Sequence, residues 1–411
     1  MVETLRPEST IGVLDAVKWA VAEETPLDVV GAGSKAVLGR SVGGECRLDL
    51  SALKGIEAYE PNELVLVAKP ATLISEIERA LRENSQQMAF EPADLGPLLG
   101  GAASAGTIGG AIACNITGPR RIKAGAARDN LLGFHAVSGR GENFKSGGRV
   151  VKNVTGFDLS KLMAGSYGTL AVMTEIIIKV LPAPEKTRTL LVIWQVGGGH
   201  DDDGVAAMTD ALTSSHEVSA AAHLPAPVAA RSAVDYVSGT SSAITAVRVE
   251  GPEPSVAYRC NELKSMLGSH APVEELHSKN SAELWREVRD VSYFAESIKQ
   301  QVWRLSVPPA SGPRVAMTIL KDNPGEVFYD WGGGLIWLAL DPNDDAGEPL
   351  VRAATADVGG YATLIRAAEE VRTRVPVFEP QPEALASITR RVKEGFDPNG
   401  VLNPGRMYEG V

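Results

Sequence analysis

A glycine-rich run near the N-terminus, Gly31-Ala32-Gly33-Ser34-Lys35, is the segment of this chain best suited to hold an anion. Glycine reaches backbone angles that let successive N–H groups converge on one phosphate group. The run directly follows the apolar residues 27–30, which predict a β-strand. A single run of this kind is also what a simple tight turn requires, so its interpretation depends on the rest of the chain.

Two further glycine segments support a nucleotide site. Residues 91–118 contain seven glycines and two prolines, and they predict a long loop whose backbone turns tightly or approaches a ligand closely. Residues 165–170 form another glycine turn, and it leads into the apolar residues 171–180, which predict a strand. Three such segments in one half of the chain make a nucleotide site the better interpretation.

The first run also matches the glycine fingerprint of Rossmann folds, with Asp49 at a suitable distance behind it. A Rossmann fold requires a helix directly after the glycines, because the N-terminus of that helix faces the pyrophosphate. Residues 37–44 contain three glycines and are unsuited to such a helix. We therefore expect a loop that binds a diphosphate through its own backbone N–H groups.

The elements expected around these segments define an α+β protein. One helix begins at Ser9 or Thr10 and a second opens at Thr72. Their periodicity directs two apolar sets inward, Ile11, Leu14, Val17 and Val21 in the first helix and Leu73, Ile74, Ile77, Ala80 and Leu81 in the second.

The second half of the chain alternates strand-like and helix-like runs, which favours a mixed or antiparallel sheet with helices on one face. Residues 200–204, rich in aspartate, are expected to form a solvated loop. The proline-containing residues 181–184 indicate a linker, which divides the chain into domains 1–183 and 184–411.

Bulk properties exclude several classes of protein. The chain has 411 residues and a formal net charge of −11, which argues against nucleic acid or an anionic membrane as the main partner. No run approaches the roughly 18 apolar residues of a membrane-spanning helix, and residues 1–10 lack the pattern of a signal peptide. Cys46, Cys114 and Cys260 lie far apart, so they form no motif for zinc or an iron–sulfur cluster, and we expect a cytoplasmic protein.

Longer motifs occur at Phe90–Gly101, Gly106–Asn115, Gly118–Lys123 and Lys152–Leu159. They resemble the FAD-binding E subunit of bacterial glycolate oxidases, a member of the vanillyl-alcohol-oxidase or PCMH-type family. The C-terminal residues 396–406 resemble the ending of FAD-linked 2-hydroxy-acid oxidases. The similarity is dense over the first 183 residues and thin over the rest.

This resemblance implies a PCMH-type FAD-binding domain of two α/β subdomains, then an α+β cap domain whose tail begins at about residue 376. It implies that the first glycine run holds the FAD pyrophosphate, that the second segment wraps the middle of the cofactor, and that the strand after Gly168 packs against the adenine end. The implied cofactor residues are Gly31, Ala32, Gly33, Ser34, Lys35, Thr107, Gly109, Gly110, Asn115, Gly118, Gly165, Gly168, Thr169, Val172 and Thr174.

The FAD is expected to be bound noncovalently. Relatives with a covalent flavin use a histidine in the first phosphate loop, and residues 31–40 contain none. Cys114 offers a thiol in the second glycine segment, but a small buried cysteine is the commoner role for such a residue.

No catalytic residue and no metal site can be assigned. Related 2-hydroxy-acid dehydrogenases carry a histidine-rich motif in the cap, whereas the six histidines here show no ligand spacing. His277 is expected at the surface. Arg304 is a weak candidate for the carboxylate of a substrate, because a structural ion pair is the preferred interpretation. Tryptophans in patterned apolar runs are expected in the core, namely Trp285, Trp303, Trp331 and Trp337.

Arg120, Arg121, Lys123 and Arg128 form a basic cluster in an acidic chain. A solvated loop explains it as well as a contact to a carboxylate, a phosphate or an acidic partner. We take Arg120, Arg121 and Lys123 as a candidate docking surface for a partner subunit.

The leading hypothesis is the FAD-binding subunit of a glycolate oxidase complex that oxidises glycolate to glyoxylate. Its implied partners are a larger flavin subunit and an iron–sulfur subunit. One alternative is a free-standing FAD-dependent dehydrogenase of D-lactate or a similar 2-hydroxy acid. Another is a non-catalytic assembly subunit that keeps a flavin fold.

Overall fold

The computed structural model describes residues 3–41, 46–149, 156–195 and 201–411. The chain forms two compact units, each described separately below. Unit 1 comprises residues 1–117, 125–183 and 376–411, and unit 2 comprises residues 118–124 and 184–375. Residues 376–411, assigned to the second domain by sequence, thus pack in unit 1, while residues 118–124 pack in unit 2.

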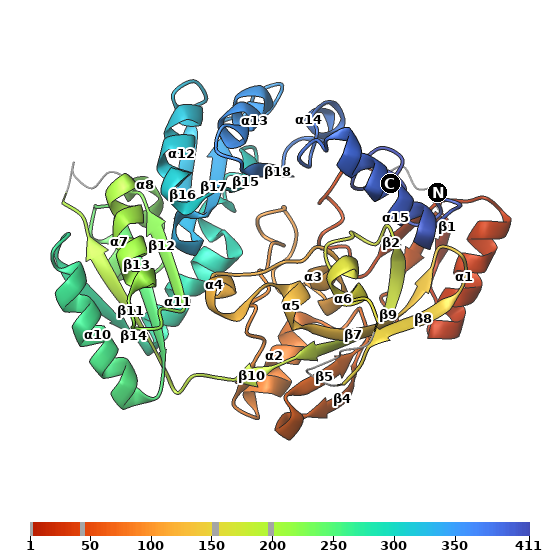
Figure 1. Ribbon diagram of the computed structural model, residues 1–411, viewed down its shortest axis with the longest axis horizontal. Coiled ribbons are helices and arrows are strands. Elements are labelled where there is room, and N and C mark those ends of the chain that lie inside the picture. Colours follow the sequence, from red (N-terminus) through yellow and green to blue (C-terminus); the bar gives the residue numbers. More distant parts are fainter. Residues whose placement is uncertain (1–2, 42–45, 150–155, 196–200) are drawn as a thin grey trace. The chain divides into compact units, whose positions relative to one another are not determined.

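Unit 1 is built on two main sheets (Figure 1). The smaller is parallel, in the order β1-β3-β2, and the larger is antiparallel, in the order β4-β5-β9-β7-β8. A short pair, β10-β6, lies outside them. The strands of unit 1 are β1 (Glu3–Leu5), β2 (Leu27–Val30), β3 (Cys46–Asp49), β4 (Ile56–Glu60), β5 (Val65–Ala68), β6 (Gln86–Gln87), β7 (Leu131–Ser138), β8 (Asn143–Gly147), β9 (Ala171–Lys179) and β10 (Leu181–Pro182).

Helices cover both sheets of unit 1. They are α1 (Thr10–Ala22), α2 (Ile74–Arg82), α3 (Ile108–Ala113), α5 (Ala127–Asn130), α6 (Leu159–Met163) and α15 (Glu383–Phe396). The last of these brings the C-terminal segment, blue in Figure 1, to the red N-terminal strand β2, where Leu402 pairs with Leu27. The ends of the chain therefore build one structure around the parallel sheet.

The predicted start of α1 is confirmed, whereas its predicted inward face is partly wrong. The Ser9 hydroxyl caps the helix by accepting from the Gly12 N–H at 3.1 Å. The buried residues are Val13, Val17 and Ala20, and Ile11 is 68% exposed. The most buried face of α1 is therefore centred on Val13, Val17 and Ala20, while Leu14 and Val21 pack at its edges, partly buried.

The second helix begins two residues later than predicted. Thr72 is fully buried, and its hydroxyl donates to the Lys69 carbonyl at 2.7 Å rather than capping α2. Ile77 and Leu81 are buried as expected, but Leu73 is 37% exposed.

Unit 2 contains one antiparallel sheet in the order β14-β11-β13-β12-β16-β17-β15-β18. Its strands are β11 (Lys186–Ile193), β12 (Ala220–Leu224), β13 (Ile244–Gly251), β14 (Val273–His277), β15 (Gln301–Ser306), β16 (Gly325–Asp330), β17 (Leu335–Leu340) and β18 (Tyr361–Arg366). Its helices are α4 (Arg121–Ala124), α7 (Asp201–Thr213), α8 (Ala226–Ala229), α9 (Asp235–Ser238), α10 (Glu253–Leu267), α11 (Ser278–Asp290), α12 (Gly312–Leu320), α13 (Glu348–Ala356) and α14 (Glu369–Arg374). The α+β prediction is therefore confirmed.

The loop predicted at residues 200–204 is a helix start instead. Asp201, Asp202 and Asp203 form the first turn of α7, where carboxylates interact favourably with the positive end of the helix dipole. His200 lies outside the described residues.

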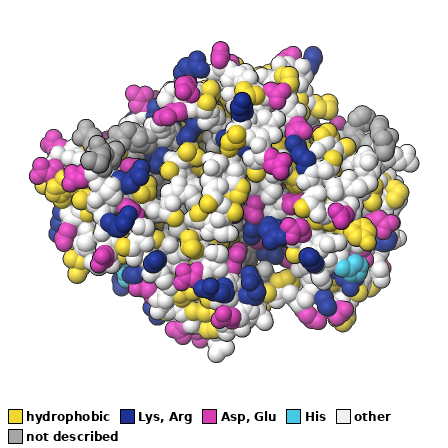
Figure 2. All heavy atoms as spheres, turned by 180° about the vertical axis from the view of Figure 1, so that it is seen from behind, with side chains coloured by type: hydrophobic (Ala, Val, Ile, Leu, Met, Phe, Trp, Pro, Cys, Tyr) yellow, Lys and Arg dark blue, Asp and Glu magenta, His cyan; other side chains and the backbone are white. Residues whose placement is uncertain are grey.

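The surface shown in Figure 2 carries acidic and basic side chains interspersed over one face. Within the described residues, no helix is long and apolar enough to cross a membrane.

Candidate cofactor-binding site

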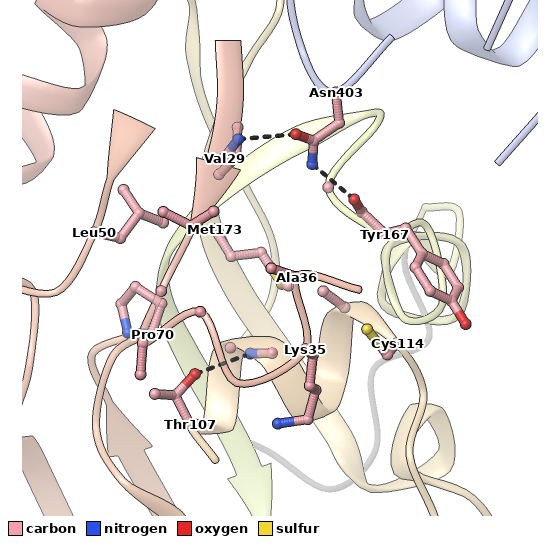
Figure 3. A pocket seen from close by; sticks show the side chains of 18 of the residues that line it. Val29, Lys35, Ala36, Leu50, Pro70, Thr107, Cys114, Tyr167, Met173 and Asn403 are labelled. Atoms are coloured by element: carbon pink, nitrogen blue, oxygen red, sulfur yellow. Dashed lines mark hydrogen bonds between the residues drawn. The ribbon is translucent and has the colours of Figure 1, made fainter. Parts of the chain in front are cut away.

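A pocket in unit 1 is lined by residues from distant parts of the chain (Figure 3). It encloses about 810 Å³ of empty space, counting its open mouth. The end of β2 and the loop after it form one wall, the start of α3 forms a second, and the start of β9 forms a third. Further lining residues come from the C-terminal segment, namely Asn403 and Arg406.

The loop from Gly31 to Lys35 presents a series of free donors. Among the described residues, none of the five backbone N–H groups of this loop donates a hydrogen bond within the protein. These residues are half-buried or exposed, so their N–H groups are accessible to a ligand that enters the pocket. A diphosphate supplies several acceptor oxygens and matches such a nest.

The glycines predicted to contact the cofactor have different local roles. Gly33 has φ +73°, and a Cβ atom built there meets nothing within 4 Å, so its missing side chain leaves open space in the pocket. At Gly109, by contrast, a Cβ would lie 2.7 Å from the Pro70 carbonyl oxygen. Gly33 therefore shapes the pocket, whereas Gly109 permits close packing of α3 on a neighbouring loop.

Lys35 is one of the cations that line this pocket, together with Arg406. Burial lowers the pKa of its ammonium group, and the nearby Cys114 and Asp94 oppose that shift. Burial favours the neutral amine, whereas a phosphate bound beside this group would favour its charged form.

Cys114 also lines the pocket. Burial raises the pKa of its thiol to about 11, against the smaller opposing effects of Lys35 and Arg406. The group is therefore a protonated thiol at neutral pH, and the thiolate needed for attack on another group is scarce.

The C-terminal segment is hydrogen-bonded to the residues on either side of the loop from Gly31 to Lys35. The Asn403 side chain accepts from the Val29 N–H at 2.8 Å and donates to the Tyr167 carbonyl at 2.8 Å, as Figure 3 shows. The Arg406 guanidinium donates to the Ala36 carbonyl at 2.8 Å. Asn403 thus joins the strand before the loop to the turn before β9, and Arg406 holds the residue after the loop.

A buried lysine anchors this segment in turn. The Lys393 ammonium donates to Asp397 at 2.7 Å and to the carbonyls of Thr169 and Leu402 at 2.7 and 2.8 Å. Sequence analysis noted residues 396–406 only as part of a resemblance, and it assigned none of them to the site.

Ten of the predicted cofactor residues line the pocket: Gly31, Ala32, Gly33, Ser34, Lys35, Thr107, Gly109, Gly110, Gly168 and Val172. Five do not line it: Asn115, Gly118, Gly165, Thr169 and Thr174. The Asn115 side chain accepts from the Arg128 N–H at 3.0 Å, and Thr169 and Thr174 are buried hydroxyls bonded to main-chain carbonyls. Gly118 packs in unit 2, where its carbonyl accepts from the Trp331 indole N–H at 3.1 Å.

Comparisons with known proteins identify the family. A family model described as "FAD binding domain" matches residues 3–147. The glycolate oxidase subunit GlcE of Escherichia coli K12 is 34% identical over 396 residues, which cover 96% of each chain. This chain belongs to the GlcE family of FAD-linked oxidoreductases. Glycolate oxidase subunit GlcD of Bacillus subtilis is 24% identical over 74% of this chain and 68% of its own length.

Solved structures support the fold of this GlcE-family chain. p-Cresol methylhydroxylase has a TM-score of 0.73 at 13% identity and covers 98% of this chain and 88% of its own. The 4-ethylphenol oxidase of Gulosibacter chungangensis has a TM-score of 0.72 at 14% identity and covers 99% and 89%. The PCMH-type fold is thereby confirmed, and FAD is the cofactor of this oxidoreductase.

The predicted docking surface is wrong at Arg120. Its guanidinium forms two hydrogen bonds with the Glu250 carboxylate, at 3.0 and 2.7 Å, and only 9% of the residue is exposed. Lys123 and Arg128 are exposed, and Lys123 pairs loosely with Glu217 at 3.5 Å. Reversing the charge of Arg120 would break a buried ion pair of unit 2, so it cannot report on docking.

The histidines that the structure describes are not clustered as metal ligands. His277 is on the surface as predicted, with its side chain 60% exposed. His223 is fully buried, and its Nδ1 lies 2.8 Å from the Thr245 hydroxyl. Within the described ranges, no group of three or more histidine, cysteine, aspartate or glutamate side chains is arranged to hold a metal ion.

Proposed function

We propose that this chain is the FAD-binding subunit of a complex that oxidises glycolate to glyoxylate. The observation that carries the proposal is the similarity to GlcE along 96% of both chains, combined with a pocket that offers five free N–H donors and a lysine. Two subunits named for glycolate oxidase occur among the relatives, which supports assembly with other subunits.

The residues of the pocket have separable roles in this proposal. The loop from Gly31 to Lys35 binds the FAD diphosphate, Lys35 offsets part of its charge, and Asn403 and Arg406 keep the loop in position. Bound FAD supplies the hydride acceptor for the oxidation of an alcohol to a carbonyl. We propose that all fifteen residues predicted by sequence contribute to FAD binding, and ten of them line the pocket.

The partners proposed for this chain are a larger flavin subunit and an iron–sulfur subunit. A 2-hydroxy acid loses the proton of its hydroxyl group during oxidation, which requires a base close to the substrate. The sequence of this chain lacks the histidine-rich motif of related dehydrogenases, and its three cysteines are too far apart for a cluster. We therefore propose that a partner completes the chemistry, and that the complex works in the cytoplasm.

We expect the isolated chain to be yellow and to reduce its flavin with glycolate slowly or not at all. Absorbance near 450 nm, recorded anaerobically before and after glycolate, measures this directly. Rapid bleaching is expected only after the two partner subunits are added. A chain that is bleached alone by D-lactate or another 2-hydroxy acid is a free-standing dehydrogenase, and a chain purified without any flavin is an assembly subunit.

We also propose that the FAD is held without a covalent bond. The high pKa of the Cys114 thiol disfavours its attack on the flavin ring. Acid precipitation should therefore release all of the flavin into the supernatant, with the Cys114→Ala variant behaving in the same way. Yellow colour that stays with the wild-type pellet and is lost in Cys114→Ala would show a thioether link instead.

A further inference from the structure

Strand β1 forms an open edge of the parallel sheet of unit 1. In the order β1-β3-β2, β1 pairs in parallel with β3, and no other strand that the structure describes pairs with it. An edge strand directs some of its N–H and C=O groups away from the sheet, where a further strand can bind them. β1 and α1 lie at the same end of unit 1 (Figure 1).

A hollow lies between β1 and α1. It holds about 670 Å³ of empty space, counting its open mouth. Glu3 and Leu5 line it from β1, whereas Thr4 between them does not, as expected for the alternating side chains of a strand. The residues that line it from α1 follow the three- and four-residue spacing of one helix face, namely Gly12, Asp15, Ala16 and Trp19.

The inner part of this hollow is apolar. Leu5, Ala16 and Trp19 are partly buried and pack against the core between α1 and the parallel sheet. A side chain that entered the hollow from outside would therefore extend this core. Half-buried tryptophans are also enriched among the residues that dominate the energy of protein interfaces.

The charges that line the hollow are unbalanced. The Arg6 guanidinium is matched by the Asp49 carboxylate, to which it donates at 2.8 Å. Glu3 and Asp15 are exposed, and neither forms an ion pair within the part of the chain that the structure describes. Two unmatched carboxylates attract a basic side chain, and the ring of Trp19 can stabilise its cation further.

We propose that β1 and this hollow bind an extended, basic segment of a partner subunit, which adds a fourth strand to the parallel sheet. This inference rests on the proposed function, which assigns partner subunits to the chain. Alternate side chains of the added strand would face α1, so that an apolar one enters the hollow and a basic one reaches Glu3 and Asp15. Because β1 has only three residues, its backbone bonds are few, and the filled hollow supplies most of the binding.

A second copy of this chain fits the edge less well than a basic segment. Two β1 strands paired edge to edge would bring the Glu3 and Asp15 carboxylates of both copies together, and like charges across strands are destabilising. The whole chain also carries a formal net charge of −11, which favours a partner of opposite charge over self-association.

The test measures the Kd between the FAD-loaded chain and a mixture of the larger flavin subunit and the iron–sulfur subunit by biolayer interferometry. Asp15→Lys should raise this Kd at least about tenfold, or ~1.4 kcal/mol, because it repels the basic segment. Glu23→Lys is the matched control. It makes the same charge change at an exposed position at the end of α1, outside the hollow, and should bind like wild type.

Glu3→Lys tests the other wall of the hollow. It alters β1 rather than α1, and it should raise the same Kd by about threefold or more. Flavin content and Tm should stay at wild-type values in both variants. Hydrogen exchange followed by mass spectrometry should show slower exchange of the amides of residues 3–5 in the complex than in the free chain. An unchanged Kd in either variant, or unchanged exchange of these amides, would overturn the inference.

Other outcomes separate this docking surface from the proposed function. Assembly that depends on Asp15, in a complex whose flavin is not reduced by glycolate, would refute glycolate oxidation and retain the docking surface. Bleaching by glycolate in a complex that assembles equally well with Asp15→Lys would support the oxidation and refute the docking surface. A wild-type chain that sediments as a dimer, and as a monomer in Glu3→Lys, would place a second copy on this edge instead.

Discussion

Gly33→Val is expected to lose FAD almost completely, with a Kd raised at least about a hundredfold, or ~2.7 kcal/mol. Two effects act together. The backbone of Gly33 has φ +73°, which a β-branched residue adopts only with strain, and the new side chain would occupy the open space above the loop. The loop would lose both its nest of N–H groups and the room for a diphosphate. Flavin fluorescence during titration of the apoprotein measures the Kd.

Gly359→Val is a matched control for the strain alone. Gly359 has φ +70°, and a Cβ built there also meets nothing within 4 Å, but the residue lies in unit 2 and outside the pocket. It should lower stability by about as much as Gly33→Val, roughly 1–2 kcal/mol, and leave FAD binding unchanged. Normal flavin content in Gly33→Val would refute the assignment of this loop to the diphosphate.

The turn from Gly31 to Lys35 and its row of backbone donors were predictable because their signal is local. A strand followed by Gly31-Ala32-Gly33-Ser34-Lys35 specifies both a turn and a row of backbone donors. The three glycines in residues 37–44 also predicted that no long helix follows the loop directly. The same local reasoning succeeded for the Ser9 cap of α1.

The rest of the site depends on contacts that no local pattern reports. Asn403 binds Val29 across 374 residues, and Arg406 reaches Ala36 across 370. In the sequence alone, a polar residue that makes such a long-range hydrogen bond looks the same as one that is exposed to solvent. The unit in which Gly118 packs could not be predicted for a related reason, because seven residues of the N-terminal half pack in the other unit.

The basic cluster shows that the role of a charged side chain depends on its burial and its partners. Arg120, Arg121 and Lys123 lie close together in the sequence, and the sequence does not distinguish their roles. In the structure Arg120 is paired and buried, Arg121 lies over a tryptophan, and Lys123 is exposed. The partner of Arg120, Glu250, is 130 residues away on β13, so only the fold separates these roles.

Arg120→Gln is expected to destabilise unit 2 by roughly 3–5 kcal/mol, because it leaves Glu250 buried with a weaker set of partners. Burial would raise the pKa of Glu250, but the guanidiniums of Arg248 and Arg120 outweigh it and lower the pKa to about 2. Urea unfolding followed by tryptophan fluorescence measures the loss. Lys123→Gln removes a cation that faces Glu217 at the exposed surface, and it should cost less than about 0.5 kcal/mol.

The same pair gives the stability of unit 2 a defined dependence on pH. A carboxyl whose folded pKa is lowered stabilises the fold above its unfolded value, here about 4.5, and loses that contribution as the pH falls toward about 2. The difference corresponds to roughly 3 kcal/mol, so wild type should weaken steeply across this window. In Arg120→Gln the folded pKa of Glu250 rises, and most of this acid-dependent loss should disappear because the stabilisation is already gone at pH 7. An unfolding free energy of Arg120→Gln that equals wild type at pH 7, with an unchanged acid profile, would mean that the Arg120–Glu250 pair contributes nothing net to the fold.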